Sequence, residues 1–122
     1  MTSDPSRDGK GLRALQVELS EILAGLEHPD LGMAAALAEE CGEVAAKLLD
    51  HHAYGEPLDR AALGGELADV LICLCEIATR HGIDLSTAVE EKAAQVAAKA
   101  PEWRKTLGEA LERSRRQQDR QH

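Results

Sequence analysis

The chain has 122 residues and a formal net charge of −8, with 22 acidic side chains against 14 lysines and arginines. An acidic chain with 2% aromatic residues lacks the charge and the stacking surfaces for binding a nucleic acid polymer. No apolar run is long enough to span a membrane and the polar start lacks the apolar region of a secretion signal, so we expect a cytoplasmic protein without a membrane partner.

The composition indicates an all-α fold in one domain. Alanine and leucine dominate, glycine and proline gather at a few junctions, and no segment alternates like a strand. We expect a bundle of four to five helices around one core. Residues 1–11 are expected to form a disordered lead-in, residues 12–112 the helical domain, and residues 113–122 a basic, flexible tail.

The first two helices are indicated by amphipathic spacing and by the break between them. The first carries apolar residues on one face: Leu12, Leu15, Leu19, Ile22, Leu23 and Leu26. The break at 27–30 ends it, and Asp30 can cap a second helix that runs to about His52. The loop 53–58, which contains glycine and proline, then closes a helical hairpin.

The third helix is expected from the N-cap Asp59 to Arg80, with Gly82 after it. Between residues 67 and 78 it carries only two charged side chains, so it is apolar nearly all round. Such a helix needs cover on more than one side. We therefore expect a homo-oligomer, a dimer or a tetramer, in which Leu71, Ile72 and Cys75 contribute to buried contacts.

Two shorter helices are expected at the end of the chain. The fourth begins near Asp84 or Ser86 and carries one stripe of valines and lysines: Val89, Lys92, Val96 and Lys99. Pro101 suits the first position of a fifth helix, because a helix start does not need the missing N–H. This fifth helix carries Trp103, Leu107 and Leu111.

Two pairs of acids have the i, i+3 spacing that places both carboxylates on one helical face. Each pair lies about 80° to the same side of an apolar stripe, so antiparallel packing of the two helices would gather all four acids at the edge of the core. Anions held together need a cation or protons, and all-oxygen ligation favours Mg²⁺, for which Mn²⁺ can substitute. The alternative is that these acids only solvate two helix faces. The pairs are Glu40 with Glu43 and Glu66 with Asp69.

The order Glu-Glu-x-x-Glu, then Glu-x-x-Asp, then a helix with a lysine resembles the MazG-like, all-α nucleoside triphosphate pyrophosphohydrolases over roughly residues 12–99. The resemblance implies a helical dimer or tetramer that uses Mg²⁺ to split a nucleoside triphosphate into the monophosphate and pyrophosphate. It implies that Glu39 orients or deprotonates water and that Lys92 contacts the substrate. The metal ligands that it implies are Glu40, Glu43, Glu66 and Asp69.

Further residues leave alternatives open. Lys47, one turn beyond Glu43, fits a phosphate contact or an ion pair within its own helix. Val96 stands where many family members have an asparagine that helps to hold metal or phosphate. One interpretation is therefore a triphosphate pyrophosphohydrolase for cleansing the nucleotide pool. The others are an enzyme like phosphoribosyl-ATP pyrophosphatase, and a non-catalytic helical oligomerisation module that binds metal or nucleotide, which Val96 favours.

Overall fold

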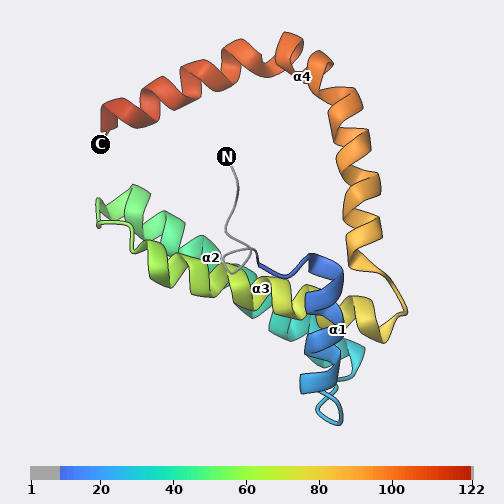
Figure 1. The fold of residues 1–122 in the computed structure, drawn as a ribbon. Coiled ribbons are helices and arrows are strands. Elements are labelled where there is room, and N and C mark those ends of the chain that lie inside the picture. Colours follow the sequence, from blue (N-terminus) through green and yellow to red (C-terminus); the bar gives the residue numbers. More distant parts are fainter. Residues whose placement is uncertain (1–8, 122) are drawn as a thin grey trace.

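The computed structural model describes residues 9–121, and within them the chain forms helices and no strand. The four helices are α1 (Leu12–Ile22), α2 (Asp30–Tyr54), α3 (Arg60–Arg80) and α4 (Leu85–Gln121) (Figure 1). The all-α prediction is confirmed. The first eight residues of the expected lead-in lie outside the described residues. Across residues 9–121, no helix combines the length and the apolar character that crossing a membrane requires.

α2 and α3 run antiparallel and make the most extensive contact between helices (Figure 1). The turn between them begins at Gly55, whose φ of 66° is readily adopted only by glycine. Asp59 caps α3 as predicted, since its side chain accepts a hydrogen bond from the Ala62 N–H at 3.1 Å. At the far end, Asp30 Oδ1 accepts a hydrogen bond from Arg80 Nε at 2.6 Å. The hairpin is therefore held at both ends.

The core is small and lies where α1, α2 and α3 meet. Its buried apolar residues are Met33, Cys73, Cys75 and Ala78. The apolar face predicted for the first helix is only partly covered, because Ile22 at the end of α1 and Leu26 in the segment after it each remain 63% exposed. On α3, Cys75 is buried as expected, whereas Leu71 remains 40% exposed. One chain therefore leaves much of its apolar surface uncovered.

A buried polar side chain, Gln16 of α1, fixes the start of α4. Its Nε2 donates hydrogen bonds to Thr79 Oγ1 at 3.3 Å and to the Ile83 carbonyl oxygen at 2.8 Å. Its Oε1 accepts a hydrogen bond from the Leu85 N–H at 3.0 Å. Leu85 is the first residue of α4, so one side chain joins α1, the end of α3 and the beginning of α4.

α4 is a single helix of 37 residues with Pro101 inside it. The prediction of separate fourth and fifth helices is therefore wrong. Proline removes one hydrogen bond and crowds the preceding turn, but on an exposed helix water can bind the carbonyl that is left, and the helix bends instead of ending. α4 is visibly curved (Figure 1). Residues 113–121 are also helical, and the flexibility expected of this basic tail stays a prediction.

α4 contacts α1, and its first half then leads away from α2 and α3, whereas its second half curves back toward the side of the α2–α3 turn without extensive contact with either helix (Figure 1). Its apolar stripe is therefore about half-exposed, at Val89, Val96, Trp103, Leu107 and Leu111. Within one chain three helices pack together and the fourth projects. The number of helices in the described residues agrees with the expected four to five, but within one chain α4 makes extensive contact only with α1.

Candidate metal centre

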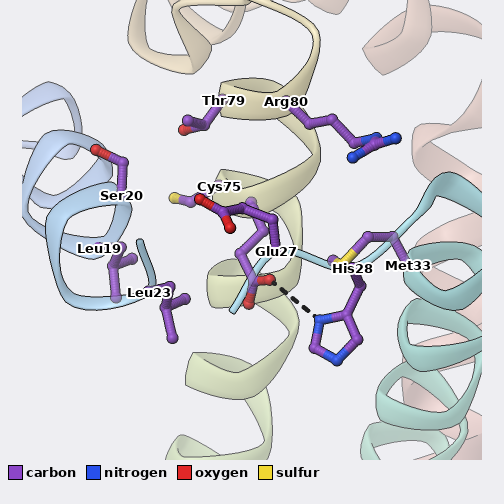
Figure 2. Close-up of a pocket in the computed structure, with 10 residues that line it drawn as sticks. Leu19, Ser20, Leu23, Glu27, His28, Met33, Cys75, Thr79 and Arg80 are labelled. Carbon is purple, nitrogen blue, oxygen red and sulfur yellow. Dashed lines mark ion pairs between the residues drawn. The ribbon is translucent and has the colours of Figure 1, made fainter. Parts of the chain in front are cut away.

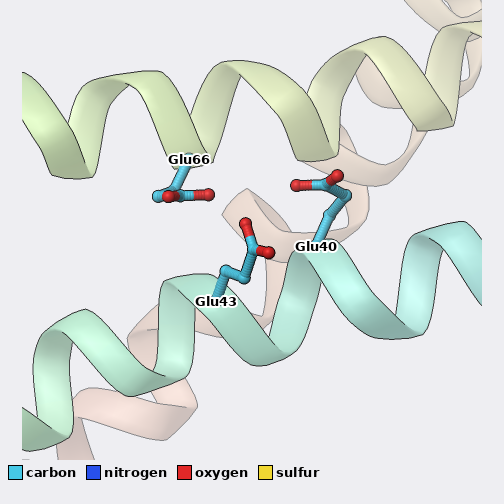
Figure 3. Close-up of side chains that lie close together, drawn as sticks. All are labelled: Glu40, Glu43 and Glu66. Carbon is cyan, nitrogen blue, oxygen red and sulfur yellow. The ribbon is translucent and has the colours of Figure 1, made fainter.

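Three of the predicted metal ligands meet between α2 and α3. Glu40 and Glu43 from α2 and Glu66 from α3 each offer one carboxylate oxygen, and these oxygens lie within 4.8 Å of one another (Figure 3). The i, i+3 spacing directs both α2 acids toward α3. The antiparallel direction of α3 then brings Glu66 opposite them. We call Glu40, Glu43 and Glu66 the acid cluster.

Asp69 borders the acid cluster without belonging to the group of converging oxygens. Its negative charge is nevertheless close enough to raise the pKa of both Glu40 and Glu43. Asp69 follows Glu66 by one turn of α3, and its carboxylate is exposed. The structure therefore places it beside the cluster, and its role as a fourth ligand stays a prediction.

The acid cluster resists full ionisation. Burial, followed by the negative charges of Glu43, Asp69 and Glu39, raises the pKa of Glu40. A hydrogen bond with Glu66, followed by the charge of Glu66, raises the pKa of Glu43. When no cation is bound, these effects favour the neutral form of the Glu40 and Glu43 carboxyls.

The donor set of the cluster fits a hard cation. Oε2 of Glu40 and Oε2 of Glu66 are buried and accept no hydrogen bond from the described residues. Buried carboxylate oxygens without a donor are unfavourable, and a cation would satisfy them. No lysine or arginine within residues 9–121 forms an ion pair with the cluster. Carboxylate oxygens are ligands that Mg²⁺ and Mn²⁺ prefer.

The other predicted site residues lie around the cluster or away from it. Glu39 is exposed on α2, and its charge contributes to the raised pKa of Glu40, so it stands at the rim. Lys47 is exposed on the same helix. Lys92 is exposed on α4, the helix that extends away from α2 and α3. The structure therefore does not bring Lys92 to the acid cluster within one chain.

Sequence reasoning missed Glu76, which continues the row of acids along α3. Glu66, Asp69, Cys73 and Glu76 follow one another at spacings of three, four and three residues, so they share one face of the helix. Burial, and then the charges of Glu76, Glu40 and Asp69, raises the pKa of the Cys73 thiol. The Cys73 thiol is therefore kept neutral by its burial and by the carboxylates of Glu76, Glu40 and Asp69. The spacing from Asp69 to Glu76 was the signal that could have found this residue.

The fold and the cluster define an all-α protein with a candidate carboxylate metal centre. A family profile described as the MazG nucleotide pyrophosphohydrolase domain matches residues 29–104, which is more than half of the chain. The matched segment includes both acid pairs and Lys92. The chain therefore belongs to the MazG family, as its acid motif indicated. No curated protein and no solved structure matches the chain significantly.

Proposed function

We propose that the protein is a Mg²⁺-dependent nucleoside triphosphate pyrophosphohydrolase that releases the nucleoside monophosphate and pyrophosphate. One observation carries the proposal: in a chain of the MazG family, three carboxylates offer oxygens within 4.8 Å of one another, and two of these acids have buried oxygens without a donor. A triphosphate carries several negative charges. It can approach such a cluster only together with cations.

The acids divide into two roles in this proposal. Glu40, Glu43, Glu66 and Asp69 hold Mg²⁺, or Mn²⁺ in its place. The bound ion would neutralise phosphate oxygens and acidify a water molecule. Glu39 lies at the rim and is exposed, so its carboxylate is available to accept the proton of the attacking water. The cleavage then produces the monophosphate and pyrophosphate without covalent attachment to the protein.

We also propose that the working unit is at least a homodimer. The apolar stripe of α4 is about half-exposed, and Leu71 of α3 is 40% exposed. Apolar side chains exposed at helical spacing along one face are typical of an interface. A second copy would cover the stripe and bring the Lys92 ammonium group of one chain toward the phosphates held by the other, where it acts as a point charge. Lys47, one turn from Glu43, is a second candidate for a phosphate contact.

The test is the release of pyrophosphate from a panel of nucleoside triphosphates and phosphoribosyl-ATP with Mg²⁺, for the parent and two variants. Asp69→Ala should weaken Mg²⁺ binding and abolish turnover together. Glu39→Gln should leave Mg²⁺ affinity within about several-fold and lower kcat by roughly 10². Glu109→Gln is the control and should match the parent, because Glu109 is exposed on α4, which makes no extensive contact with α2 or α3.

Each outcome of the panel selects one interpretation. Full activity in Glu39→Gln with loss in Asp69→Ala would remove the base assignment and leave the metal site. Turnover confined to phosphoribosyl-ATP would favour the interpretation as an enzyme like phosphoribosyl-ATP pyrophosphatase. Mg²⁺ or nucleotide binding without any turnover would select the non-catalytic module, and Val96, exposed on α4, would then account for the loss.

A further inference from the structure

A cavity of about 340 Å³ lies between α1, the segment that joins α1 to α2, and α3 (Figure 2). Leu19, Leu23, Met33 and Cys75 give it apolar walls, and six polar side chains, among them Glu76 and His28, complete the lining. A volume of this size falls within the range of small-ligand pockets. The mixture of apolar walls and a few polar groups suits a flat heterocycle with hydrogen-bonding edges.

The Glu76 carboxylate is half-buried and available for hydrogen bonding. Its side chain is 22% exposed, and its Oε2 lies 3.9 Å from His28 Nδ1, the ion pair drawn dashed in Figure 2. That distance exceeds a hydrogen bond. The carboxylate can therefore still accept hydrogen bonds from a ligand. The neighbouring imidazole supplies an N–H donor directly beside this acceptor.

The cavity and the acid cluster lie along the same face of the α2–α3 hairpin. Glu76 follows Asp69 by seven residues on α3, and Met33 precedes Glu40 by seven residues on α2. Two helical turns correspond to about 10 Å. This is about the reach of a nucleotide from its α-phosphorus to the far edge of its base. On α3, Cys73 lies between Asp69 and Glu76 in the sequence and is buried.

We propose that this cavity is the nucleobase pocket of the hydrolase, and that Glu76 selects bases with an exocyclic amino group. The inference rests on the proposed function, since the phosphates must lie at the acid cluster. The carboxylate accepts a hydrogen bond from the amino group, and the His28 ring donates one to the acceptor atom beside it. Cytosine and guanine offer such donors. Uracil presents a carbonyl oxygen in place of the amino group, and hypoxanthine presents only hydrogen.

The selectivity follows from the cost of an unpaired carboxylate. Opposite uracil, Glu76 would face a carbonyl oxygen and would lose its water without gaining a donor. A site that hydrogen-bonds a substrate N–H can reject an analogue that lacks it by large factors. Because Glu76 keeps 22% of its surface exposed, we expect a smaller factor, about 10 or more in kcat/KM.

The experiment compares kcat/KM for CTP against UTP and for GTP against ITP. In the parent we expect each ratio to favour the amino-bearing base by about 10-fold or more. Glu76→Gln should bring the CTP/UTP ratio to about unity, because the amide can also donate to the carbonyl oxygen of uracil. It should also lower the GTP/ITP ratio, because a neutral amide left without a donor opposite hypoxanthine costs less than a carboxylate. The Mg²⁺-induced shift in melting temperature should stay at the parent value.

Glu27→Gln is the matched control at the same cavity. Glu27 also lines it, but hydrogen bonds with the backbone of Glu27 and Gly25 lower the pKa of this carboxyl, so its oxygens are already engaged. This variant should keep both ratios. Ratios near unity in the parent, or parent ratios retained in Glu76→Gln, would overturn the pocket assignment and leave the hydrolase standing.

Binding of the monophosphates separates this inference from the proposed function. Saturation-transfer NMR with CMP and UMP needs no turnover. We expect contacts to CMP that weaken in Glu76→Gln and remain in Glu27→Gln. Such binding by a chain that hydrolyses no triphosphate would support the pocket and remove the hydrolase. Absence of CMP binding would overturn the assignment of the cavity as a nucleobase pocket. This result is expected if a side chain of a second copy fills the cavity.

Discussion

Replacing Gln16 by methionine should destabilise the fold more than its position on a short helix suggests. Methionine has nearly the same length and shape but offers no amide. The variant therefore removes the hydrogen bonds to Thr79 and Ile83 and the one from Leu85. These bonds join α1 to the end of α3 and to the start of α4.

The magnitude follows from three lost hydrogen bonds at a side chain that is 9% exposed. Each contributes about 1 kcal/mol net, and buried backbone groups left without partners cost more. The Leu85 N–H loses its acceptor, although a backbone N–H group in the first turn of a helix can donate a hydrogen bond to water instead. We therefore expect a loss of about 2–4 kcal/mol in the free energy of unfolding, or roughly 8–15 °C in melting temperature for a chain of this size.

Urea unfolding followed by far-ultraviolet circular dichroism measures this loss. Arg13→Met is the control at the same junction, since it removes the exposed ion pair between Arg13 Nε and Asp84 Oδ2 at 2.8 Å. Exposed pairs contribute little, so the control should lose much less stability. If Gln16→Met unfolded within about 0.5 kcal/mol of the parent with the same m-value, the buried junction would not hold α4 in solution.

Three further predictions concern the cluster and the assembly. Without a divalent cation, Glu43→Gln should raise the melting temperature because it removes a repelling charge. In the parent, Mg²⁺ at 100 times Kd should raise the melting temperature by roughly 10 °C, and the variant should lose most of this increase. Scanning fluorimetry with and without EDTA measures both effects. A variant that melts above the parent under both conditions, or below it under both, would contradict the prediction. The pKa values of Glu40 and Glu43 are raised in the folded chain. These two side chains therefore stabilise the metal-free fold at pH values below the ordinary pKa of glutamate, and this contribution to the free energy of unfolding is lost as pH rises through their folded pKa values. Over the same interval Mg²⁺ affinity should increase with proton release; calorimetric titrations showing a pH-independent affinity would refute this. Light scattering should give at least a dimer at micromolar concentration and a smaller mass for Leu107→Glu, whereas a monomeric parent would disprove the proposed assembly.

The spacing of residues along the sequence predicted the features that depend only on the geometry of a single helix. Periodicity indicated α1, α2 and α3, and the i, i+3 rule placed Glu40 and Glu43 side by side because both features depend only on helical geometry. The position of Glu66 opposite them required one further step, antiparallel packing of the hairpin. The course of α4 could not be predicted from Pro101, since whether proline starts or bends a helix depends on solvent exposure of the preceding turn.

Contacts between distant segments were beyond sequence reasoning. Gln16 interacts with partners 63, 67 and 69 residues away, so no local pattern marks it as a buried polar residue. The His28 ring reaches Glu76 only because of the path taken between α1 and α2. Lys92 follows the family motif in sequence but lies on α4, which makes no extensive contact with α2 or α3, so the motif alone did not place it relative to the acid cluster.

The central claim is that the acid cluster supports metal-dependent cleavage between the α- and β-phosphates. ³¹P NMR of a nucleoside triphosphate incubated with the protein and Mg²⁺ tests it directly, because it identifies the products. We expect the monophosphate and pyrophosphate to appear together, with no diphosphate intermediate, and neither to appear with EDTA or with Glu66→Gln. Diphosphate and orthophosphate as products, or cleavage unchanged by EDTA and by Glu66→Gln, would contradict the claim.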